Sequence, residues 1–335
     1  MKAMAVSRHD VAAWVFAATA LIGILALHLL PALLAGLLVY ELTHRLAARL
    51  PGGLGSGRKT LALILLAIVV VLAVTGAIIG ALAFFRSDQG SLTVLLGKMA
   101  EIIEGARDKL PAWLADKLPG NTDQIREAVG HWLREHAAEL QTLGKEAGHA
   151  FAHILIGMVI GAMAALREAC AQADSAPLAT ALSERIRRFA TAFRQIVFAQ
   201  VKISAVNTVF TAVYLAFALP LLGIHLPLTK TLVAVTFVAG LIPVLGNLIS
   251  NAVIVIVSLS HSLEAAVASL VFLVVIHKLE YFLNARIVGA GVGAKAWELL
   301  VAMLVMESIF GVPGVVAAPI YYAYLKGELV DRGLV

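Results

Sequence analysis

Several ionisable and amide side chains interrupt otherwise apolar parts of the chain. His277, Glu280 and Asn284 stand at i, i+3 and i+7, which places them on one face of a helix, and Arg286 is near enough to neutralise Glu280. An ionised side chain in an apolar medium costs at least about 2.5–3.5 kcal/mol, so it needs a partner, a cavity or a function. Two interpretations stay open, namely a buried ion pair with interhelical hydrogen bonds, and a carboxylate that exchanges protons.

A second set of polar residues lies beside interruptions of apolar segments. Glu307 precedes Gly311, and it is an alternative to Glu280 as the residue that changes charge. Asn247 and Asn251 stand one helical turn apart after Pro243, where they could bind a solute or a cation.

Two apolar segments are broken by glycine and proline. Residues 231–263 carry no ionised side chain, yet 33 residues at 1.5 Å each make a rod of roughly 50 Å, longer than the hydrocarbon of a bilayer. This segment must tilt, break or fold back. Broken membrane helices are typical of transport sites, although a simple kink is the alternative at both places. The breaks contain Gly240, Pro243 and Gly246 in the first segment, and Gly311, Pro313 and Gly314 in the second.

Other kinds of chemistry find little support. The glycine-rich residues 52–60 lack the Walker spacing, because Arg58 separates Gly57 from Lys59. Glu146, His149 and His153 share a helical face, which hydrated polar residues do more often than metal ligands. The sequence pairs no nucleophile with a base. We therefore expect no enzyme activity, no metal and no cofactor.

The composition indicates a membrane protein. Of 335 residues, 61% are hydrophobic and 14% are charged, against about 45–50% and 25% in soluble domains, and the mean hydropathy is +0.92. The single Cys170 excludes a disulfide scaffold. The charges are scattered, which argues against nucleic acid as a partner despite a net charge of +5. Membrane lipids are the expected surroundings.

These segments predict an all-α, polytopic transmembrane bundle with about eight spans, Gly/Pro-broken helices and a small helical insert outside the cytoplasm. Lys326 and Arg332 favour a single crossing by residues 231–263 and a carboxyl terminus inside, whereas a fold-back is expected to move that terminus outside. The expected parts are transmembrane helices in 1–85, an extracytoplasmic amphipathic insert in 86–150, a transmembrane helix plus a cytoplasmic amphipathic helix in 151–202, and a core with broken helices in 203–335.

Four stretches resemble the AI-2E family of bacterial transporters, the autoinducer-2 exporter family. The resemblance covers nearly the whole chain, and its most specific part is the last 110 residues. It rests on residues 30–40, on 223–227 with the Ile-Pro-x-x-Gly break at 242–246, on 277–289, and on 310–314 with Pro319. It implies export of a quorum signal or sodium/proton antiport in the bacterial inner membrane.

Together these observations predict a secondary transporter that moves a small molecule or an ion by alternating access around the two breaks. Glu280 or Glu307 would couple transport to a proton or sodium gradient. Small residues along 231–263 and 311–319 permit close helix packing and a homo-oligomer. The alternative is a membrane scaffold without transport, whose insert binds an envelope partner.

Overall fold

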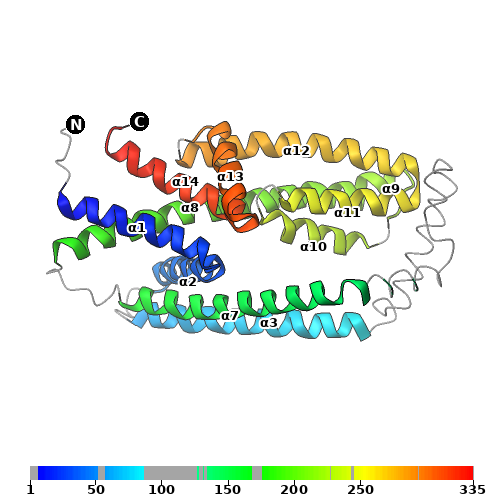
Figure 1. Cartoon of the computed structure of the whole chain (residues 1–335). Helices are drawn as coiled ribbons and strands as arrows, with labels where there is room; N and C mark the ends of the chain where they lie inside the picture. Colours follow the sequence, from blue (N-terminus) through cyan, green and yellow to red (C-terminus); the bar gives the residue numbers. More distant parts are fainter. Residues whose placement is uncertain are drawn as a thin grey trace. The chain divides into compact units, whose positions relative to one another are not determined.

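A computed structural model of the chain, shown in Figure 1, confirms the all-α class. It describes residues 7–51, 57–86, 127, 131, 134–167, 176–226, 228–242, 245–292 and 294–334, and these contain helices and no strand. The helices are α1 (Arg8–Ala26), α2 (Leu30–Arg49), α3 (Gly57–Arg86), α7 (Ala137–Arg167), α8 (Pro177–Val213), the π-helix η3 (Tyr214–Ala218), α9 (Leu219–Leu221), α10 (Thr229–Gly240), α11 (Leu245–His261), α12 (Leu263–Val292), α13 (Ala296–Phe310) and α14 (Val312–Asp331).

The chain divides into two compact units. Unit 1 contains residues 1–75, 142–197 and 288–335, and unit 2 contains residues 76–141 and 198–287. Helix α8 is continuous across the boundary at residue 197, so it contributes to both units. It also crosses the expected boundary at residue 202, and the four-part division of the chain stays a prediction. Most of the expected insert lies outside the described residues, and its last part forms the start of α7.

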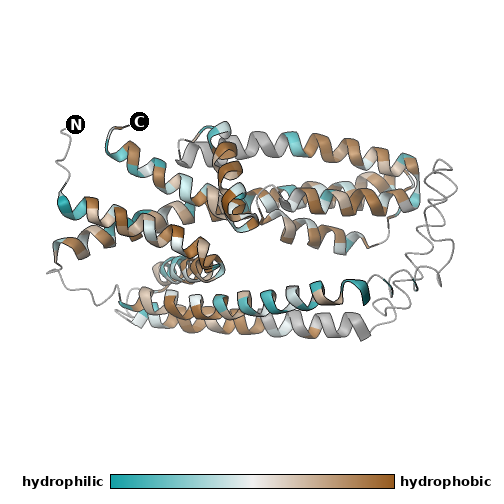
Figure 2. Cartoon of the chain, viewed as in Figure 1, coloured by the Kyte–Doolittle hydropathy of each residue, from teal (hydrophilic) through white to brown (hydrophobic). Residues whose placement is uncertain are grey.

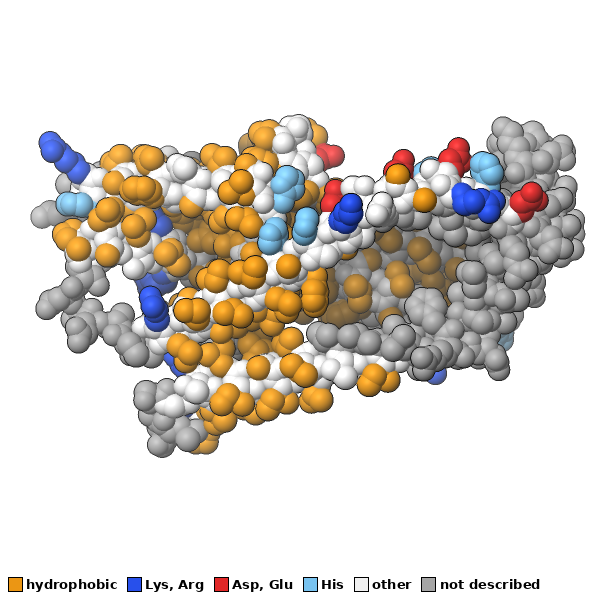
Figure 3. Space-filling view, turned by 60° about the horizontal axis from the view of Figure 1, so that its bottom comes forward, with side chains coloured by type: hydrophobic (Ala, Val, Ile, Leu, Met, Phe, Trp, Pro, Cys, Tyr) orange, Lys and Arg blue, Asp and Glu red, His pale blue; other side chains and the backbone are white. Residues whose placement is uncertain are grey.

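Large apolar side chains cover much of the described surface, as expected for helices surrounded by lipid. Figure 2 shows long hydrophobic runs along the helices, and Figure 3 shows hydrophobic side chains predominating on one face. Examples are Val69 and Leu72 on α3, and Val159 and Ile160 on α7, each about 60% exposed. Within the described residues, Arg8–Ala26, Ala137–Arg167 and Pro177–Leu221 are long and apolar enough to cross a membrane. Thr229–Gly240 and Leu248–Leu259 are shorter apolar helices. The number of helices in the described residues is roughly compatible with the predicted eight spans.

In unit 1, the first apolar run forms two helices because the backbone turns before Pro31. Helix α1 ends at Ala26, and His28 takes a left-handed conformation with φ of 57°. Pro31 then stands in the first turn of α2, where its missing N–H removes no helical hydrogen bond.

Small residues bring α2 and α7 into backbone contact within unit 1. A Cβ atom on Gly157 would lie 2.1 Å from the Ala32 carbonyl oxygen, and one on Gly161 would lie 2.0 Å from that of Gly36. Ala32 and Gly36 stand four residues apart on α2, as do Gly157 and Gly161 on α7. Each helix therefore presents one row of small residues to the other. Because lipid supplies no hydrophobic drive between helices, this close packing is a main source of attraction between α2 and α7.

Helices α13 and α14 form a second close pair in unit 1. They are joined at Gly311, whose φ of 64° and ψ of −147° suit glycine, and Gly314 packs against the Met306 carbonyl oxygen. At the far ends of both helices, Glu298 accepts hydrogen bonds from Lys326 at 2.5 Å and from Tyr322 at 2.7 Å. The two helices are therefore antiparallel, and α14 returns the chain to the end where α13 begins.

Residues 231–263 fold back as the α10–α11 hairpin, so the favoured single crossing is wrong. The side of the membrane on which the carboxyl terminus lies stays a prediction. Arg332 lies 3.6 Å from Asp10, which places both termini at the same end of unit 1. The last apolar segment forms a second hairpin, α13–α14, which brings the chain back to the end of unit 1 where α13 begins.

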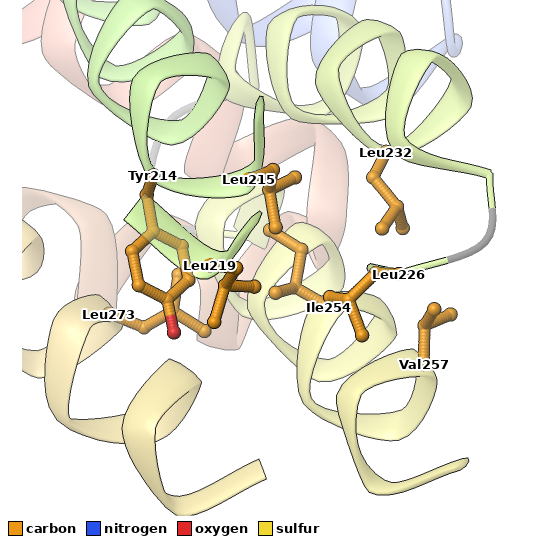
Figure 4. Packing of buried hydrophobic residues seen from close by; sticks show 8 residues of the cluster. All are labelled: Tyr214, Leu215, Leu219, Leu226, Leu232, Ile254, Val257 and Leu273. Atoms are coloured by element: carbon orange, nitrogen blue, oxygen red, sulfur yellow. The ribbon is translucent and has the colours of Figure 1, made fainter. Parts of the chain in front are cut away.

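Unit 2 is organised around the end of α8. The π-helix η3 precedes Pro220, which has no N–H for the regular helical bond, and the Leu219 N–H reaches back to the Tyr214 carbonyl. Apolar side chains of this region pack against α10, α11 and α12 in the cluster of Figure 4. Its buried members are Tyr214, Leu215, Leu219, Leu226, Leu232, Ile254, Val257 and Leu273.

We predict that Gly157→Ala destabilises the protein, since the new methyl group would overlap the Ala32 carbonyl and push α2 away from α7. The expected loss is about 1–3 kcal/mol, typical of overpacking, and should appear as a lower unfolding temperature in detergent. Gly148→Ala on the same helix is the matched control, because a Cβ atom there meets nothing within 4 Å. Equal unfolding temperatures for both variants would contradict the close crossing.

Candidate functional site

The predicted interruption at residues 240–246 is the tight turn of the α10–α11 hairpin in unit 2. Helix α10 ends at Gly240, and α11 begins at Leu245. A Cβ atom on Gly246 would lie 1.7 Å from the Ala239 carbonyl oxygen, so the start of α11 rests directly on the last turn of α10. A side chain at this position would force the two helices apart.

Side chains from α8 hold the carbonyl end of α10. Gln200 Nε2 donates to the Gly240 carbonyl oxygen at 2.7 Å, and Ser204 Oγ donates to the Phe237 carbonyl oxygen at 2.7 Å. Ser204 also packs against Gly240, where a Cβ atom would lie 2.7 Å from the serine oxygen. The last carbonyls of a helix have no partner within that helix. Helix α8 therefore satisfies polar backbone that the break would otherwise leave unpaired.

These two residues begin a polar stripe along α8. Gln200, Ser204, Asn207 and Thr211 are spaced four, three and four residues apart, on one face of the helix. Ser204, Asn207 and Thr211 are buried, as are Thr236 on α10 and Ser250 on α11. All these side chains are neutral hydroxyls or amides that can both donate and accept hydrogen bonds. Such groups can bind an uncharged polar solute without the penalty of a buried charge.

A separate chain of hydroxyls joins η3 to α11 and α12. Tyr214 Oη lies 3.0 Å from Ser269 Oγ, which in turn lies 2.7 Å from Ser258 Oγ. The Tyr214 ring stacks on Phe272 with centroids 3.9 Å apart. These contacts fix the π-helical turn against α12 and, through Ser269, link it to the second helix of the hairpin.

The predicted residues of the 277–286 region lie on one continuous helix, α12. His277 is exposed. The side chains of Glu280, Asn284 and Arg286 lie outside what the structure describes. Their roles, and the pairing of Glu280 with Arg286, stay predictions.

At the first break, the structure brings Gly240 and Gly246 together. Asn251 is half-buried on α11. Pro243 and the side chain of Asn247 lie outside the described residues. Binding of a solute by these residues also stays a prediction.

The second break belongs to unit 1, as the turn of the α13–α14 hairpin. It gathers Gly311, Pro313 and Gly314, with Gly314 buried and Pro313 in the first turn of α14. Glu307 is exposed on α13, and its backbone carbonyl accepts the Gly311 N–H at 2.7 Å. Each break thus forms its own hairpin, and their shared participation in a site stays a prediction. Among the described residues, no three His, Cys, Asp or Glu side chains are grouped as a metal site.

Sequence reasoning missed the residues that support the first break. The spacing of Gln200, Ser204 and Thr211 on the face of Asn207 was a usable signal, because hydroxyls and amides recur there within an apolar helix. It also missed the buried ion pair of Arg185 and Glu328, whose partners stand 143 residues apart. No local spacing could reveal that pair.

We predict that Gly246→Ala opens the hairpin turn and lowers transport at least tenfold, because the methyl group would overlap the Ala239 carbonyl. Gly76→Ala is the control, since a Cβ atom there meets nothing within 4 Å. Solute flux into vesicles, normalised to inserted protein, measures the effect. Unchanged flux in Gly246→Ala would show that the tight turn is not needed.

Comparisons with known proteins identify the family of the chain. No curated protein and no solved structure matches it. A family profile described as AI-2E family transporter matches residues 11–330, which is nearly the full length. The suspected resemblance is confirmed: this chain belongs to the AI-2E transporter family, and it is a multi-pass membrane transporter of small solutes.

Proposed function

We propose that the protein is a secondary transporter that exports a small polar solute, such as a molecule of the autoinducer-2 kind, by alternating access coupled to a proton or sodium gradient. The observation that carries this proposal is the α10–α11 hairpin, whose broken backbone is held by neutral polar side chains of α8. Irregular backbone at membrane depth persists where protein or a water-filled cavity satisfies it, and transporters place their binding sites at such breaks.

The lengths of the hairpin helices support a turn inside the bilayer. Helix α10 has 12 residues, which span about 18 Å at 1.5 Å per residue, against roughly 30 Å of hydrocarbon. A turn between α10 and α11 therefore falls at mid-depth if Thr229 lies at the membrane surface. The stripe of Ser204, Asn207 and Thr211 would then supply hydrogen bonds to a solute at this depth.

Coupling to a gradient requires a group that changes charge during the cycle. Glu280 and Glu307 are the candidates, with Arg286, His277 and Asn284 as neighbours of Glu280 along α12. Protonation or sodium binding at one carboxylate would lower the free energy of moving that carboxylate through the apolar region.

The setting proposed for this cycle is the bacterial inner membrane. The protein would work there as a homo-oligomer in contact with membrane lipids, with a small molecule or an ion as cargo. Exposed apolar side chains on α3, α7 and α13 support contact with lipids or with further copies.

We predict that Glu280→Gln leaves the protein folded and inserted but abolishes gradient-driven flux in proteoliposomes, because the amide cannot change charge. Glu307→Gln gives this result instead if Glu307 is the coupling residue. Glu139→Gln in the first turn of α7 is the control, since that side chain is exposed and should not affect flux. Gradient-driven flux that survives both Glu280→Gln and Glu307→Gln would refute carboxylate coupling by these residues.

A further inference from the structure

Ionised side chains of three helices meet at one end of unit 1. Arg185 on α8 and Glu328 on α14 form an ion pair at 2.5 Å, and their side chains are only 5% and 8% exposed. Trp14 on α1 donates its indole N–H to Glu328 at 3.3 Å, and Arg332 lies over the Trp14 ring. The contacts tie the start of α8 and the end of α14 to α1.

The buried pair is poorly suited to be a purely structural fastening. Arg185 Nε is buried without a hydrogen-bond partner among the described residues, and the charge nearest to Glu328 Oε1 is Arg188 Nε, at the long distance of 3.8 Å. Desolvation of two charges is offset only when their remaining hydrogen bonds are also satisfied, and an apolar pair of similar volume often stabilises a protein equally well. The incomplete hydrogen bonding of Arg185 and Glu328 therefore fits a contact that opens to water better than one that stays closed.

Arg188 offers the charges alternative partners. Its Nε lies 2.8 Å from Glu184 and 3.8 Å from Glu328, and its Nη1 contacts Asp331. A shift of α14 along α8 by one turn would let Arg188 exchange Asp331 for Glu328. Glu184, on the same helix as Arg188, would remain its partner during such a shift.

Water has room to reach this network. A half-open cavity of about 360 Å³ lies between α8 and α14, with Arg188, Glu328 and Asp331 on its wall. Its other lining residues include the small Ala192, Ala323 and Gly327. A cavity of this size has space for several water molecules, which could solvate the charges as they separate.

We propose that Arg185 and Glu328, with Arg188 as the exchange partner, form an ionic latch between α8 and α14 that must open and close in each transport cycle. Both are positioning residues, because they act through the two helices and need no contact with the cargo. This inference rests on the proposed function for its role in transport. The same helix α8 continues to Gln200 and Ser204, which hold the α10–α11 hairpin.

The test compares the native latch with an apolar one. In a Cys170→Ser background, Ala323→Cys places one thiol in the cavity wall, where the native residue is buried. The rate of its reaction with a membrane-impermeant maleimide reports opening and requires no cargo. The comparison protein carries Arg185→Met and Glu328→Leu in addition, which fill similar volume without charge. Solute flux and unfolding temperature are measured on both proteins.

We expect the apolar pair to keep the unfolding temperature, while both thiol labelling and flux fall at least tenfold, because apolar side chains resist entry of water. Equal labelling and equal flux would overturn the latch. A protein with the native latch that is labelled rapidly yet carries no flux would refute the transport function and leave the opening of the latch supported.

A second variant serves if the apolar pair does not fold. Arg188→Cys with Asp331→Cys, in the Cys170→Ser background, places two thiols at a native contact between α8 and α14 and leaves Arg185 and Glu328 intact. A bifunctional methanethiosulfonate, about as long as the arginine side chain that it replaces, can join the two thiols, because a direct disulfide needs Cα atoms within about 7 Å. Cross-linking should stop flux and reduction should restore it, with each single-cysteine variant as control. Full flux in the cross-linked protein would show that transport does not require the latch to open.

Discussion

Backbone carbonyl and amide groups inside a bilayer need partners within the protein, and this requirement explains the most specific contacts of the chain. Where α10 stops at Gly240, its last carbonyls accept hydrogen bonds from Gln200 and Ser204 on α8. Glycines at the turn let the helices approach closely enough for these bonds to form. The break after α10, the close glycine contacts and the polar stripe of α8 thus act together, because each is needed to give the backbone at the break its hydrogen-bond partners.

The two units differ in the kind of polar side chain that they bury. In unit 2, the described buried polar side chains are neutral, mainly serine and threonine, which suits hydrogen bonding at membrane depth. In unit 1 they include Glu41, Arg185 and Glu328, each with an opposite charge within 4 Å. Neutral groups can bind and release a polar solute at low cost, whereas paired charges resist separation until water arrives. The first arrangement suits a binding region and the second suits a gate.

Much of this architecture could be predicted from composition and local pattern. The lipid environment, the all-helical class and both glycine-proline breaks follow from residue types and spacing alone. The direction of the chain after each break could not be predicted, because a break at Gly240 or Gly311 is compatible with a kink as well as a hairpin. Contacts between distant residues, such as Arg185 with Glu328, also leave no local signal. The coupling role of Glu280 remains a prediction, since its basis is spacing within α12.

The central claim is that the turn of the α10–α11 hairpin lies within the bilayer and is reached by water. Ile242 stands in this turn and is 40% exposed, so a spin label there should disturb little. Its accessibility to oxygen, which concentrates in lipid, and to a water-soluble nickel complex measures its depth. The account predicts a label near mid-depth that the nickel complex still reaches. A label at the level of the lipid headgroups, or one reached by oxygen alone, would contradict it.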